Sequence, residues 1–225
     1  MLPTPEITDI DYDKVYEPAE DSFLLLDCFE EEKEYLQKRF TSSVPIVTEI
    51  GAGSGIVTTF LQRNILQKSI FMCTDVNPHA CTTILNTVKT NNVKTGEEKI
   101  PYIVDSFQMD RTTAIRSQSI DVLVFNPPYV PAEDVPKIPT TYDDSTWLDL
   151  ALLGGEDGMV TTWKVLDNLD QILSTNKGVA YILFCARNKP DSVADKMKSR
   201  GWDVKTIIHR KAGWEVLSVL RFTRI

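Results

Sequence analysis

The sequence predicts an α/β protein with a central sheet of seven strands, mostly parallel and covered by helices on both faces. Five short, nearly continuous apolar runs alternate with helical patterns, which is typical of buried parallel strands joined by right-handed crossovers. The chain then ends in two strand-like runs on either side of residues 211–213, which indicates an antiparallel hairpin. The sequence therefore predicts a mixed sheet.

The elements follow in a regular order along the chain. Residues 18–40 predict a leading helix, with Leu early and Glu and Lys later. The expected parallel strands cover residues 46–50, 69–75, 100–106, 120–126 and 178–186, and the hairpin strands cover residues 202–210 and 214–225. Apolar residues recur at helical spacing from Val57, and again after Pro78, which suits a first helical turn. A third helical pattern runs from Met159 to Leu173.

We expect one domain over residues 1–225, because no Gly/Ser-rich linker divides the sequence. It comprises an N-terminal extension and helix (1–45), a first half of the sheet (46–129), a long loop (130–158) and a C-terminal half with the hairpin (159–225). The loop follows the carboxyl end of a strand, where open α/β sheets bind ligands, and structureless loops of this length are uncommon. We expect a substrate-facing loop or lid there, with a plain surface connection as the alternative.

The composition argues against several classes of protein. The 24 basic and 32 acidic residues give a net charge of −8, and an acidic chain is repelled by nucleic-acid phosphates. The four cysteines form no CxxC pair, so no metal site is expected, and His79 and His209 are expected to be ordinary structural or surface residues. No run reaches the ~18 apolar residues of a membrane span, and the N-terminus lacks a signal peptide. We expect an intracellular, soluble, cytoplasmic protein, with the nucleus left open as a second compartment.

The first motif is a glycine-rich turn, EIGAGSG at residues 49–55, between the first strand and its helix. Glycines allow a sharp turn and a close approach of the backbone to a ligand. The G-x-G-x-G spacing differs from the G-x-G-x-x-G of dinucleotide sites. The carboxylate of Glu49 suits a cationic ligand group better than a pyrophosphate, so we interpret this turn as a binding site for such a ligand.

Acidic residues end the next two strands. Asp75, followed by Val76, can accept both hydroxyl groups of a ribose, although a carboxylate shortly before Pro78 also suits a helix N-cap. The run Asp105-Ser106-Phe107 places a carboxylate beside an aromatic ring. That pair suits the amino group and ring of an adenine, with a plain cap as an equal alternative.

The most specific motif is Asn126-Pro127-Pro128-Tyr129, which ends the fourth strand. Two prolines cannot continue a central strand, because both lack an N–H donor. The side chain of Asn126 and the carbonyl of Pro127 then remain as fixed acceptors beside the flat ring of Tyr129. Two acceptors and a ring suit a planar –NH2 group.

Together these motifs resemble the class I S-adenosylmethionine-dependent methyltransferases, and Asn-Pro-Pro-Tyr resembles the members that methylate planar amino or amide nitrogens. Two further segments, VYEPAEDS at residues 15–22 and LGGEDG at residues 153–158, are similar to the eukaryotic and archaeal HemK-like release-factor glutamine methyltransferases. The resemblance covers nearly the whole chain. It implies the Rossmann-like fold of that class.

The resemblance also implies a set of site residues, with S-adenosylmethionine as cofactor. The implied catalytic residues are Asn126, Pro127, Pro128 and Tyr129. The implied cofactor-binding residues are Tyr16, Pro18, Ser22, Glu49, Gly51, Ala52, Gly53, Ser54, Gly55, Asp75, Val76, Asp105, Ser106, Phe107 and Asn126. The implied substrate is the glutamine of the Gly-Gly-Gln loop of the class I translation termination factor.

The resemblance further implies a heterodimer with a small zinc-binding activator subunit. In this fold the third strand lies at an edge of the sheet, and the apolar residues 100–104 at that edge could pair with the activator. Coverage of the edge by loops of this chain is the alternative.

Three other functions remain open at this point. An adenine-N6 methyltransferase on DNA or RNA would use the same acceptors, but such enzymes must also flip the base and hold the backbone. A lysine ammonium has three donors and fits the planar site less well. An inactive cofactor-binding scaffold would be favoured by loss of Asn126 or of a glycine, and neither is lost.

Overall fold

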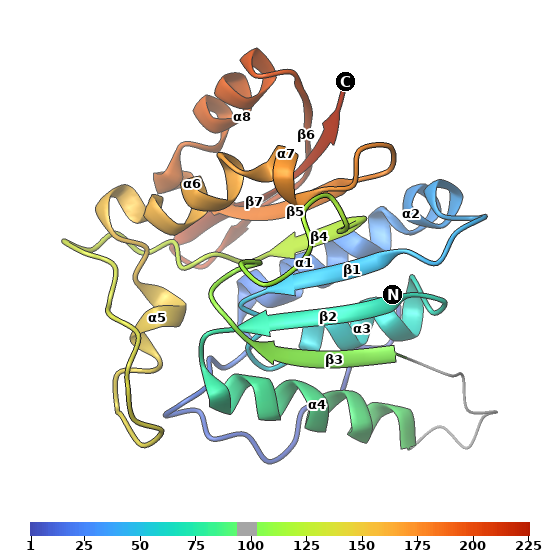
Figure 1. Ribbon diagram of the computed structural model, residues 1–225. Helices are drawn as coiled ribbons and strands as arrows, with labels where there is room; N and C mark the ends of the chain where they lie inside the picture. Colours follow the sequence, from blue (N-terminus) through green and yellow to red (C-terminus); the bar gives the residue numbers. More distant parts are fainter. Residues whose placement is uncertain (94–102) are drawn as a thin grey trace.

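The computed structural model describes residues 1–93 and 103–225 of the protein. Its strands are β1 (Ile46–Ile50), β2 (Ile70–Asp75), β3 (Ile103–Gln108), β4 (Val122–Phe125), β5 (Val179–Cys185), β6 (Trp202–Ala212) and β7 (Glu215–Arg224). They form a seven-stranded sheet in the order β3-β2-β1-β4-β5-β7-β6 (Figure 1). The first five strands run parallel, and β7 lies antiparallel between β5 and β6. The predicted mixed sheet is confirmed.

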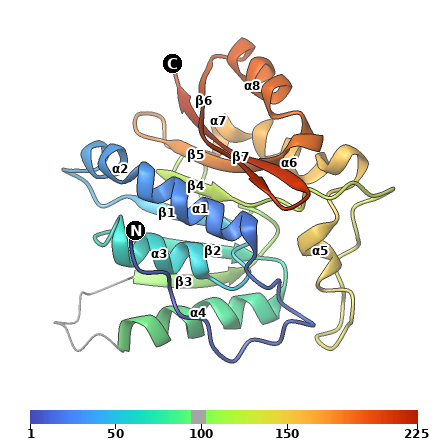
Figure 2. The ribbon, with the colours of Figure 1, turned by 180° about the vertical axis from the view of Figure 1, so that it is seen from behind.

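Helices cover both faces of this sheet (Figures 1 and 2). The helices are α1 (Glu20–Glu31), α2 (Lys33–Arg39), α3 (Ile56–Asn64), α4 (Pro78–Val93), α5 (Asp149–Leu152), α6 (Val160–Leu166), α7 (Leu169–Ile172) and α8 (Pro190–Ser199), with 3₁₀ turns at Glu156–Gly158 and Ala186–Asn188. The first four lie on one face, and α6, α7 and α8 lie on the other. None of the helices in the described residues is long and apolar enough to cross a membrane.

The side chains of β4 divide the interior into two apolar cores. Val122 and Val124 pack with the helices α1, α2 and α3, whereas Leu123 and Phe125 pack with α6, α7 and α8. Successive side chains of a strand point to opposite faces of its sheet. Because helices cover both faces, all four residues of β4 and all seven of β5 are buried. This burial explains the continuous apolar runs in the sequence.

Two helical predictions differ from the structure, and one helix was not predicted. The leading helix is interrupted at Glu32, whose buried carboxylate accepts hydrogen bonds from the hydroxyl of Tyr181 (2.7 Å) and from Arg221 (2.6 Å). The pattern from residue 159 to 173 forms two helices, α6 and α7, rather than one. The helix α8 was not predicted, because only three of its ten residues are buried and the apolar signal is weak.

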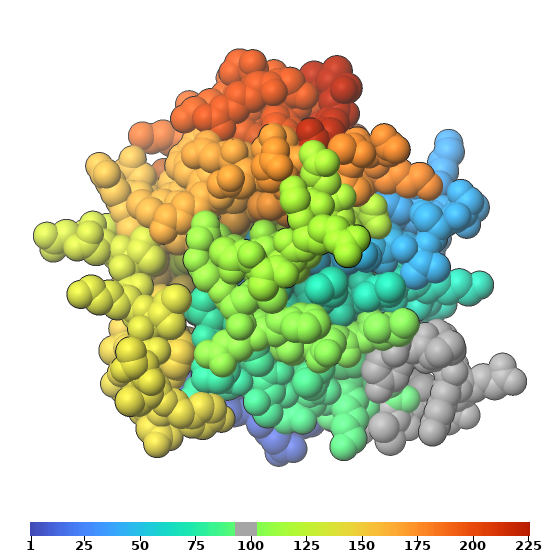
Figure 3. Space-filling view, in the orientation of Figure 1, coloured from blue at the N-terminus to red at the C-terminus, as the bar shows by residue number. Residues whose placement is uncertain are grey.

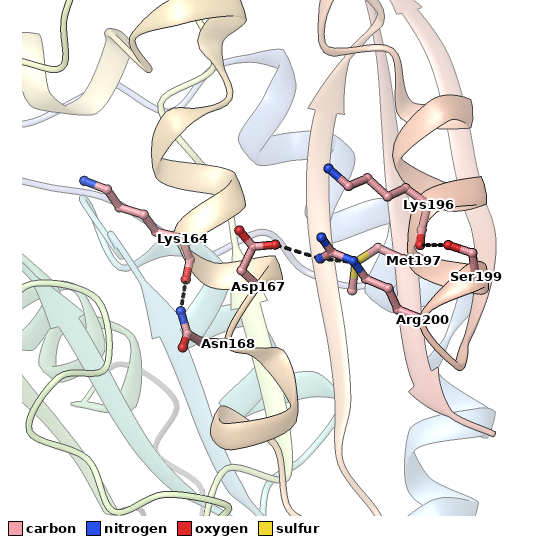
Figure 4. A network of polar contacts seen from close by, with 7 residues as sticks. All are labelled: Lys164, Asp167, Asn168, Lys196, Met197, Ser199 and Arg200. Atoms are coloured by element: carbon pink, nitrogen blue, oxygen red, sulfur yellow. Dashed lines mark hydrogen bonds and ion pairs between the residues drawn. The ribbon is translucent and has the colours of Figure 1, made fainter.

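The turn between α6 and α7 contacts the helix α8 (Figure 4). A carboxylate oxygen of Asp167 pairs with Arg200 at 2.6 Å, and the ammonium of Lys196 lies 4.1 Å from the centre of the Trp163 ring. Asn168 donates to the carbonyl of Lys164 at the end of α6 (2.9 Å). These contacts hold α6, which lines the site described below, against the C-terminal part of the fold.

The outer strand β3 differs most from its prediction. Residues 100–102 of the expected strand lie outside the described residues, and β3 continues to Gln108 rather than ending at residue 106. Its parallel register with β2 places Gln108 opposite Asp75 and Asp105 opposite Met72. The loop that leaves the carboxyl edge of the sheet therefore begins at Met109.

Candidate active site

A cavity of about 620 Å³ opens at the carboxyl ends of β1, β2 and β4. This volume lies within the range of ~300–1,000 Å³ that is common for small-molecule sites. Its walls combine strand ends with the N-terminal segment 14–22, the loop 109–111, part of the segment 130–152, the helix α6 and Glu215. Open α/β sheets bind ligands at this edge, where the strand order reverses.

The glycine-rich turn forms the floor of the cavity after β1. Gly51, Gly53 and Gly55 all have positive φ angles (62°, 53° and 75°), which side chains other than glycine rarely adopt. A Cβ atom on Gly51 would meet no atom within 4 Å, so the backbone there is open to a ligand. A Cβ on Gly55 would lie 2.9 Å from the Cα of Ile84, so Gly55 serves the packing of α3 on α4 instead.

Two carboxyl groups are buried beside this turn. An oxygen of Glu49 accepts hydrogen bonds from the backbone N–H (2.9 Å) and the hydroxyl (2.5 Å) of Thr58, and burial raises the pKa of Glu49 to about 8. Asp75 accepts from the backbone N–H of Gly53 (3.1 Å) and of Asn77 (2.9 Å), yet burial raises its pKa to about 6. A ligand with positive charge or hydroxyl donors would stabilise the ionised form of both groups.

The side chain of Asn126 is oriented by a carboxylate from a distant part of the chain. Its Nδ2 donates to Oδ2 of Asp21 in α1 at 2.9 Å. The other oxygen of Asp21 accepts from the backbone N–H of Ser22 (2.7 Å) and from the hydroxyl of Tyr16 (3.3 Å). Oδ1 of Asn126 is buried without a hydrogen-bond partner within the described part of the chain. It is therefore an acceptor free for a ligand donor in the cavity wall.

Tyr129 is held in a similar way from the opposite end of the sequence. Its hydroxyl donates to Oε2 of Glu215, the first residue of β7, at 3.1 Å. Burial, together with the charges of Asp21 and Glu215, raises the pKa of Tyr129 above its usual value, so the phenol stays protonated. The Tyr129 side chain is thus held in place, and Tyr129 and Asn126 both line the cavity.

The segment LGGEDG closes against the backbone of the Asn-Pro-Pro-Tyr motif. The N–H of Val130 donates to the carbonyl of Leu152 (3.0 Å), and the N–H of Gly154 donates to the carbonyl of Val130 (2.8 Å). A Cβ on Gly154 would lie 2.1 Å from the carbonyl oxygen of Pro128, and one on Gly158 would lie 2.0 Å from that of Tyr129. Both glycines therefore allow an approach that no side chain would permit.

The expected long loop covers one side of the cavity and forms one edge of the molecule (Figure 3). It is tied to the N-terminal segment by Lys14, whose ammonium donates to the carbonyls of Asp143 (3.0 Å) and Asp144 (2.8 Å). It is tied to α4 by His79, whose Nε2 lies 2.8 Å from the carbonyl oxygen of Tyr142 and whose ring packs on that of Tyr142. His79 thus has a structural contact.

Most of the predicted site residues line this one cavity. They are Tyr16, Ser22, Glu49, Gly51, Ala52, Gly53, Ser54, Asp75, Val76, Asn126, Pro127, Pro128 and Tyr129. Pro18 and Gly55 do not line it.

Asp105, Ser106 and Phe107 do not line the cavity either, so their role in holding an adenine stays a prediction. The strand β3 extends past them, and the side chain of Asp105 is exposed. The wall at this place consists of Met109, Asp110 and Arg111 instead.

Two residues whose carboxylates contact the Asn-Pro-Pro-Tyr motif were not predicted. Asp21 lies inside the quoted segment VYEPAEDS, so its motif carried a signal, but its contact with Asn126 spans 105 positions. Glu215 directly follows the hairpin turn, and no local pattern connects it with Tyr129, 86 positions earlier.

The comparisons with known proteins agree with this geometry. The sequence model of the Methyltransferase small domain family matches residues 21–138. The chain is 37% identical to "Methyltransferase HEMK2" of Mus musculus over 214 residues, which cover 93% of this chain and 90% of that relative. It is 35% identical to "eRF1 methyltransferase catalytic subunit mtq2" of Schizosaccharomyces pombe over 231 residues, which cover 100% and 97%.

A solved structure has the same fold. In the Mtq2-Trm112 complex of E. cuniculi, described as responsible for the methylation of the eRF1 termination factor, the matched chain superimposes with a TM-score of 0.64 at 24% identity. The match covers 94% of this chain and 99% of that one.

Fold, cavity and motifs define a class I methyltransferase, an enzyme that takes its methyl group from S-adenosylmethionine. Within that class, the chain belongs to the HemK-like glutamine methyltransferase family.

Proposed function

We propose that this protein methylates the side-chain nitrogen of the glutamine in the Gly-Gly-Gln loop of the class I translation termination factor. The observation that carries the proposal is the buried Oδ1 of Asn126, which has no hydrogen-bond partner among the described residues and needs an N–H donor, in a cavity that Tyr129 also lines. The printed names of relatives support the same substrate, among them a "Putative protein N5-glutamine methyltransferase" of Methanocaldococcus jannaschii, 28% identical over 212 residues.

The residues of the cavity fit S-adenosylmethionine. The open backbone at Gly51 can pass under the methionine part, and Glu49 can face its cationic groups. Asp75 and Val76 can hold the ribose. Met109, Asp110 and Arg111 line the cavity after β3 and can contact the adenine. The bound cofactor supplies an electrophilic methyl group on its sulfonium.

The chain itself contributes alignment rather than a strong base. An amide nitrogen is a poor nucleophile, because its lone pair is delocalised into the carbonyl. Oδ1 of Asn126 and the carbonyl of Pro127 would accept the two N–H bonds, while the ring of Tyr129 packs on the amide plane. These contacts orient the nitrogen and favour the positive charge that develops on it. The nitrogen becomes acidic once methylated and then loses its proton without a dedicated base.

The proposal includes a small zinc-binding activator subunit, since the related E. cuniculi chain was solved with a partner, Trm112. The outer strand β3 offers an edge for strand addition: the side chain of Ile103 is 60% exposed, whereas that of Val104 packs inward. We expect Ile103→Lys to weaken co-purification of the activator. Full-strength binding by that variant would rule out this edge.

We further propose that the chain acts as one catalytic domain in the cytoplasm.

The test is methyl transfer from labelled S-adenosylmethionine with the activator present. The substrates are the intact termination factor, the factor with its Gly-Gly-Gln glutamine changed to alanine, and duplex DNA. We expect label on the intact factor alone. Equal label on both forms of the factor would favour a lysine substrate, and label on DNA would favour an adenine substrate, so either result would overturn the proposal.

A further inference from the structure

Two aromatic side chains are exposed next to residues that line the active-site cavity. Trp214 is 100% exposed at the turn of the β6–β7 hairpin, and Phe23 is 41% exposed in the first turns of α1. Phe23 directly follows Ser22 and Trp214 directly precedes Glu215 in the chain. Ser22 and Glu215 both line the cavity. We propose that Trp214 and Phe23 form a docking surface for the polypeptide that flanks the methylated glutamine.

The position of Trp214 is fixed by its neighbours. Ala212 and Glu215 pair across the hairpin, so Gly213 and Trp214 form a two-residue turn. The carboxylate of Glu215 accepts from the hydroxyl of Tyr129, which ties the end of the hairpin to the cavity wall. The turn that carries the exposed indole is therefore anchored next to a residue of the cavity wall.

Phe23 lies on the side of α1 that faces this hairpin. Asp27, one helical turn further on, pairs with Arg210 of β6 at 2.6 Å. Residues four apart share a face of a helix, so Phe23 continues that face toward the start of α1. Figure 2 shows the start of α1 beside the turn of the hairpin. The turn that carries Trp214 and the first turns of α1 that carry Phe23 thus lie side by side, next to residues that line the cavity.

The chemistry of this surface suits a protein loop. Tryptophan is rarely left fully in water, and aromatic side chains are enriched among the residues that dominate protein interfaces. The cavity takes the cofactor and one side chain, so the backbone on either side of a target glutamine must cross its rim. Two basic residues, Arg210 and Lys211, precede the turn, and Arg210 is already paired with Asp27, which leaves the surface better suited to apolar side chains than to phosphates.

This inference rests on the proposed function, and one set of measurements separates the two. The variants Trp214→Ala and Phe23→Ala are compared with wild type in complex with the activator. The readouts are kcat and KM for the intact termination factor, Kd for the factor by calorimetry, and Kd for S-adenosylmethionine. A matched control is Val44→Ala, because Val44 is 61% exposed but precedes β1 at the opposite end of the sheet.

We expect Trp214→Ala to raise KM and Kd for the factor about tenfold, in the range of an interface hot spot, with kcat and cofactor binding unchanged. Phe23→Ala should have a smaller effect in the same direction, Trp214→Phe should retain most of the affinity, and Val44→Ala should change nothing.

If the wild type methylates the factor and both alanine variants keep the same KM and Kd for it, the docking surface alone is overturned. A wild type that neither binds nor methylates the factor would overturn both proposals. A loss of kcat without a change in KM would show a disturbed active site and would also overturn the docking surface.

Discussion

The two sides of the cavity are built in different ways. On the cofactor side, the polar contacts join residues close in sequence: Glu49 with Thr58, and Asp75 with Gly53 and Asn77. On the substrate side, the two main contacts join Asn126 to Asp21 and Tyr129 to Glu215, across 105 and 86 positions. The contacts of the binding turn thus lie within the consecutive elements β1, α3 and β2 and the turn after them, whereas the orientation of the substrate depends on the complete fold.

The largest expected effect is that of Asn126→Ala. It removes one of the two acceptors proposed for the substrate amide, and a misaligned amide should lower kcat by at least about 100-fold. Cofactor affinity should change little, because the contacts of the glycine turn remain. Single-turnover methyl transfer and calorimetry with S-adenosylmethionine measure the two quantities. A variant with normal kcat would show that Asn126 does not hold the substrate.

Asp21→Ala should have the next largest effect. It leaves Nδ2 of Asn126 without its acceptor, so the amide can rotate and present a donor to the substrate. We expect kcat to fall by about tenfold to 100-fold. The matched control is Glu20→Ala, an exposed carboxylate in the same first turn of α1, which should retain full activity.

A pair of glycine variants sharpens the comparison on the cofactor side. Gly51→Ala and Gly55→Ala both place a side chain at positive φ, which costs about 1–2 kcal/mol of stability. Only the Gly55 variant adds a collision with Ile84, so it should have the lower free energy of unfolding. The Gly51 variant should instead weaken cofactor binding about tenfold, because its Cβ enters the cavity. Equal cofactor affinities would contradict this division.

A smaller effect is expected from pH. In the unfolded chain Asp75 and Glu49 have pKa values near 3.8 and 4.5, and in the folded protein these rise to about 6 and about 8. The stability that these protonated groups contribute is full below their unfolded pKa values and is lost as pH rises through the folded ones. The Tm of the free protein should therefore fall between pH 4.5 and 8.

Cofactor affinity should change in the opposite direction. A cationic ligand favours ionised Glu49, so affinity should rise a few-fold from pH 7 to pH 8, below the limit of about tenfold per pH unit for one proton. Binding should release a proton, which calorimetry in buffers of different ionisation enthalpy detects. An affinity that does not change with pH would mean that the cation lies away from Glu49.

The same division explains what the sequence could predict. The glycine turn, Asp75 and Asn-Pro-Pro-Tyr were recognised because each is a short local pattern at a strand end. The end of β3 could not be predicted, because it is set by the pairing with β2, where Gln108 rather than Asp105 lies opposite Asp75. Asp21 and Glu215 were missed because their roles exist only once α1 and the hairpin pack beside β4.

The most direct test of this account is a double-mutant cycle on Asp21 and Asn126. The kcat of wild type, Asp21→Ala, Asn126→Ala and the double variant is measured with the activator and the intact termination factor. If Asp21 acts by orienting Asn126, the double variant should be no slower than Asn126→Ala, within about twofold. If the two losses multiply instead, Asp21 acts independently of Asn126, and the account of the substrate side is contradicted.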